Sequence, residues 1–162
     1  MTPPARPVDH HYETTVVWTG NRGTGTSSYR DYGRENEVST PGKPTIQSSA
    51  DAAFRGDASR WNPEDLLMAA LAECHMLSYL HQAAVAGVVV TDYVDTATGT
   101  MQMNRDGGGQ FTEVTLHPKV TVLDESMRDK AMQLHGPAGE GCFIAGSVNF
   151  PVHHAPTVVV TS

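Results

Sequence analysis

The chain has 162 residues, about the usual size of one domain, and 39% of them are hydrophobic while 18% are charged. Its formal net charge of −7 reflects 18 acidic against 11 basic residues, and such a surface repels phosphate backbones and anionic lipid headgroups. The chain has no run of the ~18 apolar residues that a membrane-spanning helix requires, and its start lacks the pattern of a secretory signal. We therefore expect a cytoplasmic protein with no nucleic-acid or membrane partner.

The first third of the chain is predicted to hold little regular structure. Residues 1–10 contain three prolines and no apolar periodicity, so we expect a flexible N-terminal arm, followed by a single domain over residues 11–162. Residues 12–18 are β-branched and aromatic, and residues 24–32 are rich in Thr, Ser and Tyr, which predicts a hairpin. Residues 33–61 are mostly polar and predict a long loop, a feature that is often functional in a small domain.

The strongest local signal marks the start of a long helix. Asn62 supplies an N-cap, Pro63 suits the first helical position, and the acidic residues Glu64 and Asp65 lie at the positive end of the helix dipole. Apolar residues continue around most of the circumference until Gly87 ends the helix. We expect this helix to be central and buried, with a second copy of the chain covering its remaining face.

The second half of the chain alternates strands and helices. Its predicted elements are strands over 88–100 and 111–123, a short helix over 124–134, a glycine-rich break over 136–141 and a closing strand over 158–160. Together with the first hairpin and the long helix, they predict an α+β fold in which antiparallel sheets pack on a buried helix.

The two cysteines are too few for a disulfide scaffold and form no CxxC pair. Cys74 lies within the long helix and is either a small buried hydrophobe or a nucleophile whose thiolate needs a neighbouring cation. Cys142 is either an unpaired structural cysteine or a resolving thiol that condenses with an oxidised Cys74.

Arginines near the helix are candidates for that cation, although each could equally be a solvated surface charge. They are Arg22, Arg30, Arg34, Arg55 and Arg60. Glu64 is either an acid stabilised by the helix dipole or the group that orients such an arginine. Ten residues of helix separate Glu64 from Cys74 by about 15 Å, so in the second case Glu64 would serve the cysteine of a second subunit.

Histidines offer a further alternative. One could imagine a metal site from residues spread over the chain, namely Cys74, His75, His81, His135 and Cys142. Neighbouring residues diverge by ~100° on a helix and no His-x3-His pair exists, so we expect no metal. The pairs His10-His11 and His153-His154 are interpreted as exposed.

Three segments resemble a known family. Residues 62–67 read NPEDLL, residues 69–76 read AALAECHM, and the second cysteine opens CFIAGSV at 142–148. These segments resemble the signature of the OsmC/Ohr family, the osmotically inducible and organic hydroperoxide resistance thiol peroxidases. The resemblance implies an OsmC-like fold, an intertwined homodimer with two long central helices, and active sites at the interface. It also implies reduction of organic hydroperoxide or hydrogen peroxide, in oxidative-stress defence, without a cofactor.

The resemblance assigns roles residue by residue. Cys74 corresponds to the peroxidatic cysteine, Cys142 to the resolving cysteine and Glu64 to the acidic partner. Arg55 fits the loop position of the family's arginine, whereas the alternatives are Arg22, Arg30 and Arg60. The implied product is a Cys74–Cys142 disulfide, which a dithiol reductant, either a small molecule or a lipoyl-type protein, must reduce.

Two departures from the family pattern indicate a divergent OsmC-like branch. Phe143 stands where a proline is common after the second cysteine, and His75 stands where many members have Phe. The apolar residues expected to favour an organic peroxide are Leu67, Leu71, Leu77 and Phe143. The rival interpretation is a non-enzymatic dimer that binds a small apolar ligand and whose cysteines are structural.

Overall fold

The computed structural model describes residues 7–161, which form two compact units. The first unit ends at Glu64 and the second begins at Asp65. Residues 1–6 of the expected arm lie outside the described residues, and residues 7–10 contain no helix or strand. No helix in the described part of the chain is long and apolar enough to cross a membrane.

The first unit contains a three-stranded antiparallel sheet in the order β1-β2-β3. Its elements are β1 (Thr15–Trp18), β2 (Asn36–Ser39), β3 (Ile46–Ser48) and the short 3-10 helix η1 (Ala52–Phe54). The predicted strand over 24–32 is wrong, because β1 pairs with β2 instead and the residues between them form turns.

Side-chain contacts hold the connection between β1 and β2 in its turn conformation. The Asn21 side chain accepts hydrogen bonds from the backbone N–H groups of Gly23 and Gly25, an arrangement typical of turns. The guanidinium of Arg34 lies 4.4 Å from the centre of the Tyr29 ring and 4.0 Å from that of Tyr32. It also donates to both tyrosine carbonyls, so this segment has no need of a strand partner.

The long helix of the chain is α1 (Pro63–Val85), which confirms the predicted start and end. Its buried residues are Leu71, His75, Tyr79 and Ala83, spaced by four so that they form one stripe along the helix. The opposite side is more open than expected, since Leu77 is 56% and Val85 74% exposed.

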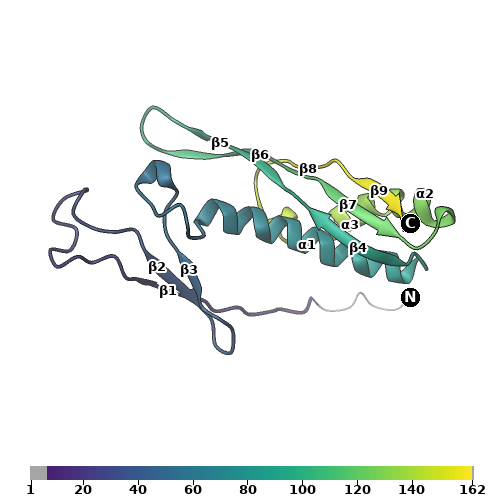
Figure 1. The fold of residues 1–162 in the computed structure, drawn as a ribbon, viewed down its shortest axis with the longest axis horizontal. Coiled ribbons are helices and arrows are strands. Elements are labelled where there is room, and N and C mark those ends of the chain that lie inside the picture. The colour runs from purple at the N-terminus through teal and green to yellow at the C-terminus, as the bar shows by residue number, and fades with distance from the viewer. Residues whose placement is uncertain (1–6, 162) are drawn as a thin grey trace. The chain divides into compact units, whose positions relative to one another are not determined.

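Six strands of the second unit form two three-stranded sheets, and α1 runs along these strands (Figure 1). The strands are β4 (Val90–Asp95), β5 (Thr98–Met103), β6 (Gly109–Leu116), β7 (Pro118–Val122), β8 (Val152–His154) and β9 (Thr157–Val160). The sheet orders are β4-β7-β9 and β5-β6-β8. The hairpin pairs β4/β7 and β5/β6 are antiparallel, whereas β6/β8 and β7/β9 are parallel. The expected α+β class is confirmed, but the sheets are mixed and each long predicted strand is divided in two.

Short helices connect β7 to β8. They are η2 (Glu125–Met127), α2 (Arg128–Gln133), α3 (His135–Glu140) and η3 (Ala145–Ser147). The predicted break over 136–141 is wrong, because the backbone N–H groups of Ala138 and Gly141 donate to carbonyls four residues earlier. Glycine lowers helix propensity, but these local hydrogen bonds and the burial of Ala138 maintain the turn.

Candidate active site

The site is built where one face of α1 meets the segment that runs from α2 to Cys142. Positions 74, 75, 78 and 79 lie on that face, because residues four apart are neighbours on a helix. The Tyr79 hydroxyl donates to the Ala131 carbonyl over 2.9 Å. A Cβ atom added at Gly141 would lie 3.1 Å from the Ser78 Oγ. The two segments are therefore in close contact along about two turns of α1.

The two cysteines meet at one end of this contact. Both are free thiols; Cys142 is buried and Cys74 is half-buried. Burial, and then a hydrogen bond with Cys74, raise the pKa of the Cys142 thiol. The backbone N–H of Ala145 lies 3.4 Å from the Cys142 Sγ, which accepts its hydrogen bond. Cys142 is thus held as a protonated thiol that can donate to Cys74, and Cys74 is the more accessible of the pair.

A second pair of side chains, His75 and His135, lies next along the same contact. The His75 Nε2 and His135 Nδ1 atoms are 3.1 Å apart, and both residues are at most 4% exposed. Tyr79 stacks on His135 with ring centres 4.2 Å apart. Burial, then His154 and His135, lower the pKa of His75 to about 3, and burial, then His154, lower that of His135 to about 4. Both imidazoles are therefore uncharged, and the two nitrogens share one proton.

His154 was expected to be exposed beside His153, and that expectation is wrong. His154 is half-buried and its ring centre lies 4.3 Å from that of His75. His153 alone faces solvent, 3.5 Å from a Glu113 carboxylate oxygen. Alternation along a strand could have separated the two histidines, because neighbouring side chains on β8 point to opposite faces. Burial lowers the pKa of His154, and Asp95 opposes this shift.

The metal site considered from the sequence would have required His81, which is exposed. Among the described residues, no group of three or more His, Cys, Asp or Glu side chains has the geometry to hold a metal ion.

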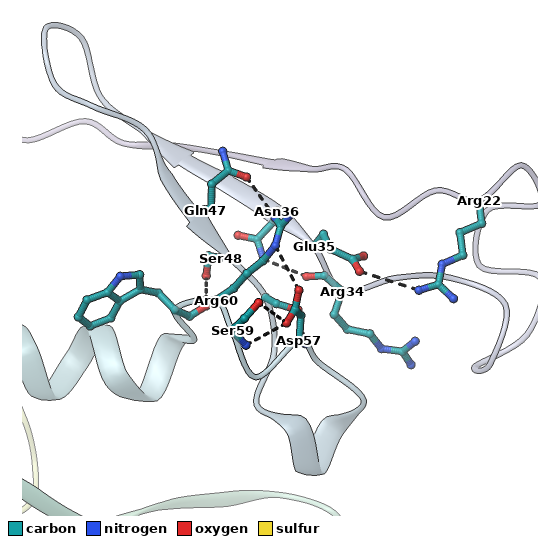
Figure 2. Close-up of polar contacts among 11 residues, drawn as sticks. Arg22, Arg34, Glu35, Asn36, Gln47, Ser48, Asp57, Ser59 and Arg60 are labelled. Carbon is teal, nitrogen blue, oxygen red and sulfur yellow. Dashed lines mark hydrogen bonds and ion pairs between the residues drawn. The ribbon is translucent and has the colours of Figure 1, made fainter.

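Several of the candidate arginines are engaged within the first unit. Figure 2 shows Arg60 between Gln47, to which it donates over 3.1 Å, and Asp57, which lies 3.6 Å away. It also shows Arg22, whose guanidinium lies 3.9 Å from Glu35. Each of these cations already has an acidic partner.

Arg55 differs from the other arginines in its backbone. It is the one non-glycine residue with a positive φ, 65°, among those that the structure describes, and it ends η1 in the left-handed conformation. That conformation costs roughly 1–2 kcal/mol for a residue with a Cβ atom, and such strain is concentrated at functional sites. The Arg55 side chain is exposed and, within the described part of its unit, has no ion-pair partner.

The predicted site residues divide between the two units. Arg55 and Glu64 belong to the first unit and Cys74 and Cys142 to the second, and the structure brings together the two cysteines. One carboxylate oxygen of Glu64, Oε2, is shielded from solvent and has no hydrogen-bond partner among the described residues. Because α1 is continuous from Pro63, ten residues of helix separate this carboxylate from Cys74.

The apolar residues expected beside the thiols have different environments. Leu71 is fully buried and belongs to the core with Val114 and Leu116, and Leu67 packs against that core. In contrast, Leu77 is 56% and Phe143 84% exposed. Leu77 and Phe143 are therefore available to an apolar group from outside the chain, whereas Leu71 is not.

Comparison with known proteins assigns the family. Residues 56–156 match the family described as OsmC-like protein. The chain belongs to this family. An OsmC-like protein of unknown function from Vibrio cholerae superimposes with a TM-score of 0.82 at 27% identity, covering 92% of this chain and all of the other. No protein of curated function matches this OsmC-like chain.

Two further relatives of this OsmC-like protein share its fold. The organic hydroperoxide resistance protein OsmC from Legionella pneumophila has a TM-score of 0.67 at 22% identity, covering 93% of this chain and 99% of the other. The organic hydroperoxide resistance protein OhrB of Bacillus subtilis has a TM-score of 0.61 at 22% identity, covering 90% of this chain and 98% of the other. The OsmC-like family thus includes proteins named for hydroperoxide resistance.

Proposed function

We propose that this OsmC-like protein is a thiol peroxidase of oxidative-stress defence that reduces organic hydroperoxides, and hydrogen peroxide less well. The main support is the pair of free thiols, in which a buried, protonated Cys142 lies against the more accessible Cys74. The nucleophilic form of a cysteine is its thiolate, and the more accessible Cys74 is the proposed nucleophile. Relatives named for organic hydroperoxide resistance agree with this chemistry.

The proposed cycle has three steps. The Cys74 thiolate attacks the outer oxygen of the hydroperoxide, the O–O bond breaks, and the alkoxide takes a proton from solvent and leaves as alcohol. This step oxidises Cys74 to sulfenic acid. Cys142 then attacks the sulfenic sulfur, an S–S bond replaces the S–O bond, and the hydroxyl leaves as water with the proton of Cys142. A dithiol reductant finally returns both cysteines to thiols and becomes a disulfide itself.

Arg55 and Glu64 complete the proposed site from the second chain of a homodimer. The backbone strain at Arg55 and the unpartnered Glu64 oxygen support a role for each beyond its own unit. A guanidinium would stabilise the Cys74 thiolate, and a carboxylate would orient the guanidinium. The exposed Leu77 and Val85 on α1 support a second chain as the cover of this helix.

Peroxide-dependent consumption of dithiothreitol tests the activity, with cumene hydroperoxide and hydrogen peroxide as alternative substrates. We expect Cys74→Ser to abolish turnover. Cys142→Ser should keep one rapid oxidation, seen as a sulfenic acid by mass spectrometry, but turn over poorly. Glutathione should be a poorer reductant than the dithiol. An intact protein that consumes no dithiol, and whose Cys74 resists alkylation until unfolding, would instead be the apolar-ligand-binding dimer.

Subunit mixing tests the shared site. A Glu64→Ala homodimer and a Cys74→Ser homodimer are each impaired at both sites, but their mixed dimer contains one site with an intact Glu64 and an intact Cys74. Activity should therefore reappear on exchange. With exchange confirmed by mass, a mixture no more active than the average of its parents would place Glu64 within its own chain.

A further inference from the structure

The contact between α1 and the segment before Cys142 is a ladder of four side-by-side pairs. Ordered along α1, the pairs join Cys74 to Cys142, His75 to His135, Ser78 to Gly141, and Tyr79 to Ala131. The histidine pair forms a side chain to side chain hydrogen bond in this ladder, and it is buried, since His75 is fully buried and His135 is 4% exposed.

The position of His135 gives this link a role at the thiols. His135 is the first residue of α3, and Cys142 lies two residues beyond its last residue, Glu140. The backbone between them is helical, and the N–H of Cys142 still donates to the Gly139 carbonyl over 3.2 Å. Because the backbone between them is helical and hydrogen-bonded, an anchor at His135 limits the positions open to Cys142.

Close packing leaves the segment little freedom to shift. A Cβ atom at Gly139 would lie 2.9 Å from the His154 Cε1, in addition to the short approach of Gly141 to Ser78. The hydrogen bond between the two imidazoles requires that one nitrogen donates and the other accepts. It therefore fixes both the distance and the register of α3 against α1.

We propose that His75 and His135 are positioning residues that hold Cys142 against Cys74 and so promote formation of the Cys74–Cys142 disulfide. In catalysis this inference rests on the proposed peroxidase function. Attack of Cys142 on the sulfenic sulfur of Cys74 is an intramolecular reaction, and its rate depends on how often the sulfurs meet in the correct orientation. Loss of the histidine link lowers that effective concentration without changing either thiol.

The equilibrium between the thiol pair and glutathione tests the inference without any peroxide. Purified protein is equilibrated in glutathione redox buffers, and the disulfide fraction is counted by mass spectrometry after alkylation. His135→Phe keeps a ring against Tyr79 but loses the hydrogen bond, and we expect its disulfide to be up to about tenfold easier to reduce, which is near the upper end of what one net hydrogen bond contributes. His135→Asn places an amide where Nδ1 was and should recover most of the loss. His81→Phe, on the exposed side of α1, is the matched control.

The same measurement is made on variants of His75. His75→Phe should lower the disulfide stability as His135→Phe does, and His75→Gln, whose amide reaches the place of Nε2, should restore it. In single turnover with cumene hydroperoxide, the Phe variants should form the Cys74 sulfenic acid at the wild-type rate but close the disulfide about tenfold more slowly. A purely structural role would not separate these two rates.

The inference would be overturned if every folded variant kept the wild-type disulfide fraction in the glutathione buffers. These variants are His75→Gln, His135→Asn and the two Phe variants. A Phe variant whose sulfenic acid and disulfide steps slow equally would also overturn it. If the wild type reduces no hydroperoxide, the proposed function fails while the glutathione measurement still decides the positioning role. If a Phe variant does not fold, the His135→Asn and His75→Gln variants are compared with the wild type instead. Both keep a hydrogen-bonding group at this place, so a disulfide that is about tenfold easier to reduce in both would overturn the inference.

Discussion

Acidification should destabilise this protein, because the folded chain buries two uncharged imidazoles. In the unfolded chain His75 and His135 have pKa values near the ordinary 6.5, whereas burial lowers these values to about 3 and about 4 in the folded chain. As pH falls below 6.5 the unfolded chain binds protons that the folded chain does not, so the free energy of unfolding falls. This loss continues until the pH approaches the folded pKa values.

The size of the effect follows from linkage. Between pH 7 and pH 5.5, each imidazole that stays neutral in the fold lowers the free energy of unfolding by about 1.2 kcal/mol, and the pair by about 2.5 kcal/mol. A protein of this size has roughly 5–15 kcal/mol in total. With a urea dependence of about 2 kcal/mol per M, the unfolding midpoint should fall by about 1 M. His154 adds to the loss, whereas Asp95, whose pKa burial raises, opposes it.

Urea unfolding at one fixed protein concentration measures this loss in the wild type and in three variants. Because the comparison is between variants, the shared contributions of other groups cancel. His75→Phe and His135→Phe should each reduce the pH-dependent loss by about half, while His81→Phe, exposed on the same helix, should leave it unchanged. The reasoning fails if all four proteins lose the same stability. Histidine proton resonances give a second measure, and a His75 signal that titrates near pH 6 in the folded protein would refute it directly.

Three further predictions follow from single contacts. Arg55→Gly should be more stable than Arg55→Ala by about 1 kcal/mol in thermal unfolding, because glycine adopts the left-handed conformation freely, yet both should lose peroxide reduction. Gly141→Ala should slow disulfide closure severalfold in single turnover, since its Cβ meets Ser78, while Gly136→Ala, which faces open space, should not. Tyr79→Phe should cost about 1 kcal/mol in urea unfolding, because the Ala131 carbonyl loses its donor.

Local chemistry accounts for the parts of the fold that the sequence predicts well. The long helix begins at Pro63 because an N-cap residue, a proline and two acids follow one another there, and all of these signals act within a few residues. The predicted strand over 24–32 failed for the opposite reason. In this segment Tyr29 and Tyr32 pack against the Arg34 guanidinium, and the Asn21 side chain closes the turn. Strand propensity contains no information about such contacts.

Long-range pairing limits what could be predicted of the site. The family pattern proposes Cys74 and Cys142 as site residues, and the structure places the two thiols next to each other. His75 and His135 were grouped only as candidate metal ligands and His154 was expected to be exposed, so the hydrogen-bonded histidine link was not predicted, because the three residues lie on elements that are distant in sequence. His75 was noted as a departure from the family pattern, and its place on the apolar stripe of α1, four residues from Leu71 and Tyr79, was the available signal.

The parallel pairings of β8 with β6 and of β9 with β7 also suggest an order in which a newly made chain brings its two thiols together. Cys142 precedes both strands, and Arg128 of α2 donates to the Val158 carbonyl on β9 over 3.2 Å. A growing chain that has released Cys142 but not Val158 therefore lacks the strands that secure the connecting segment at its far end. We therefore expect the cysteines to behave as two separate thiols during elongation, and their selective pairing to begin when β9 docks on β7.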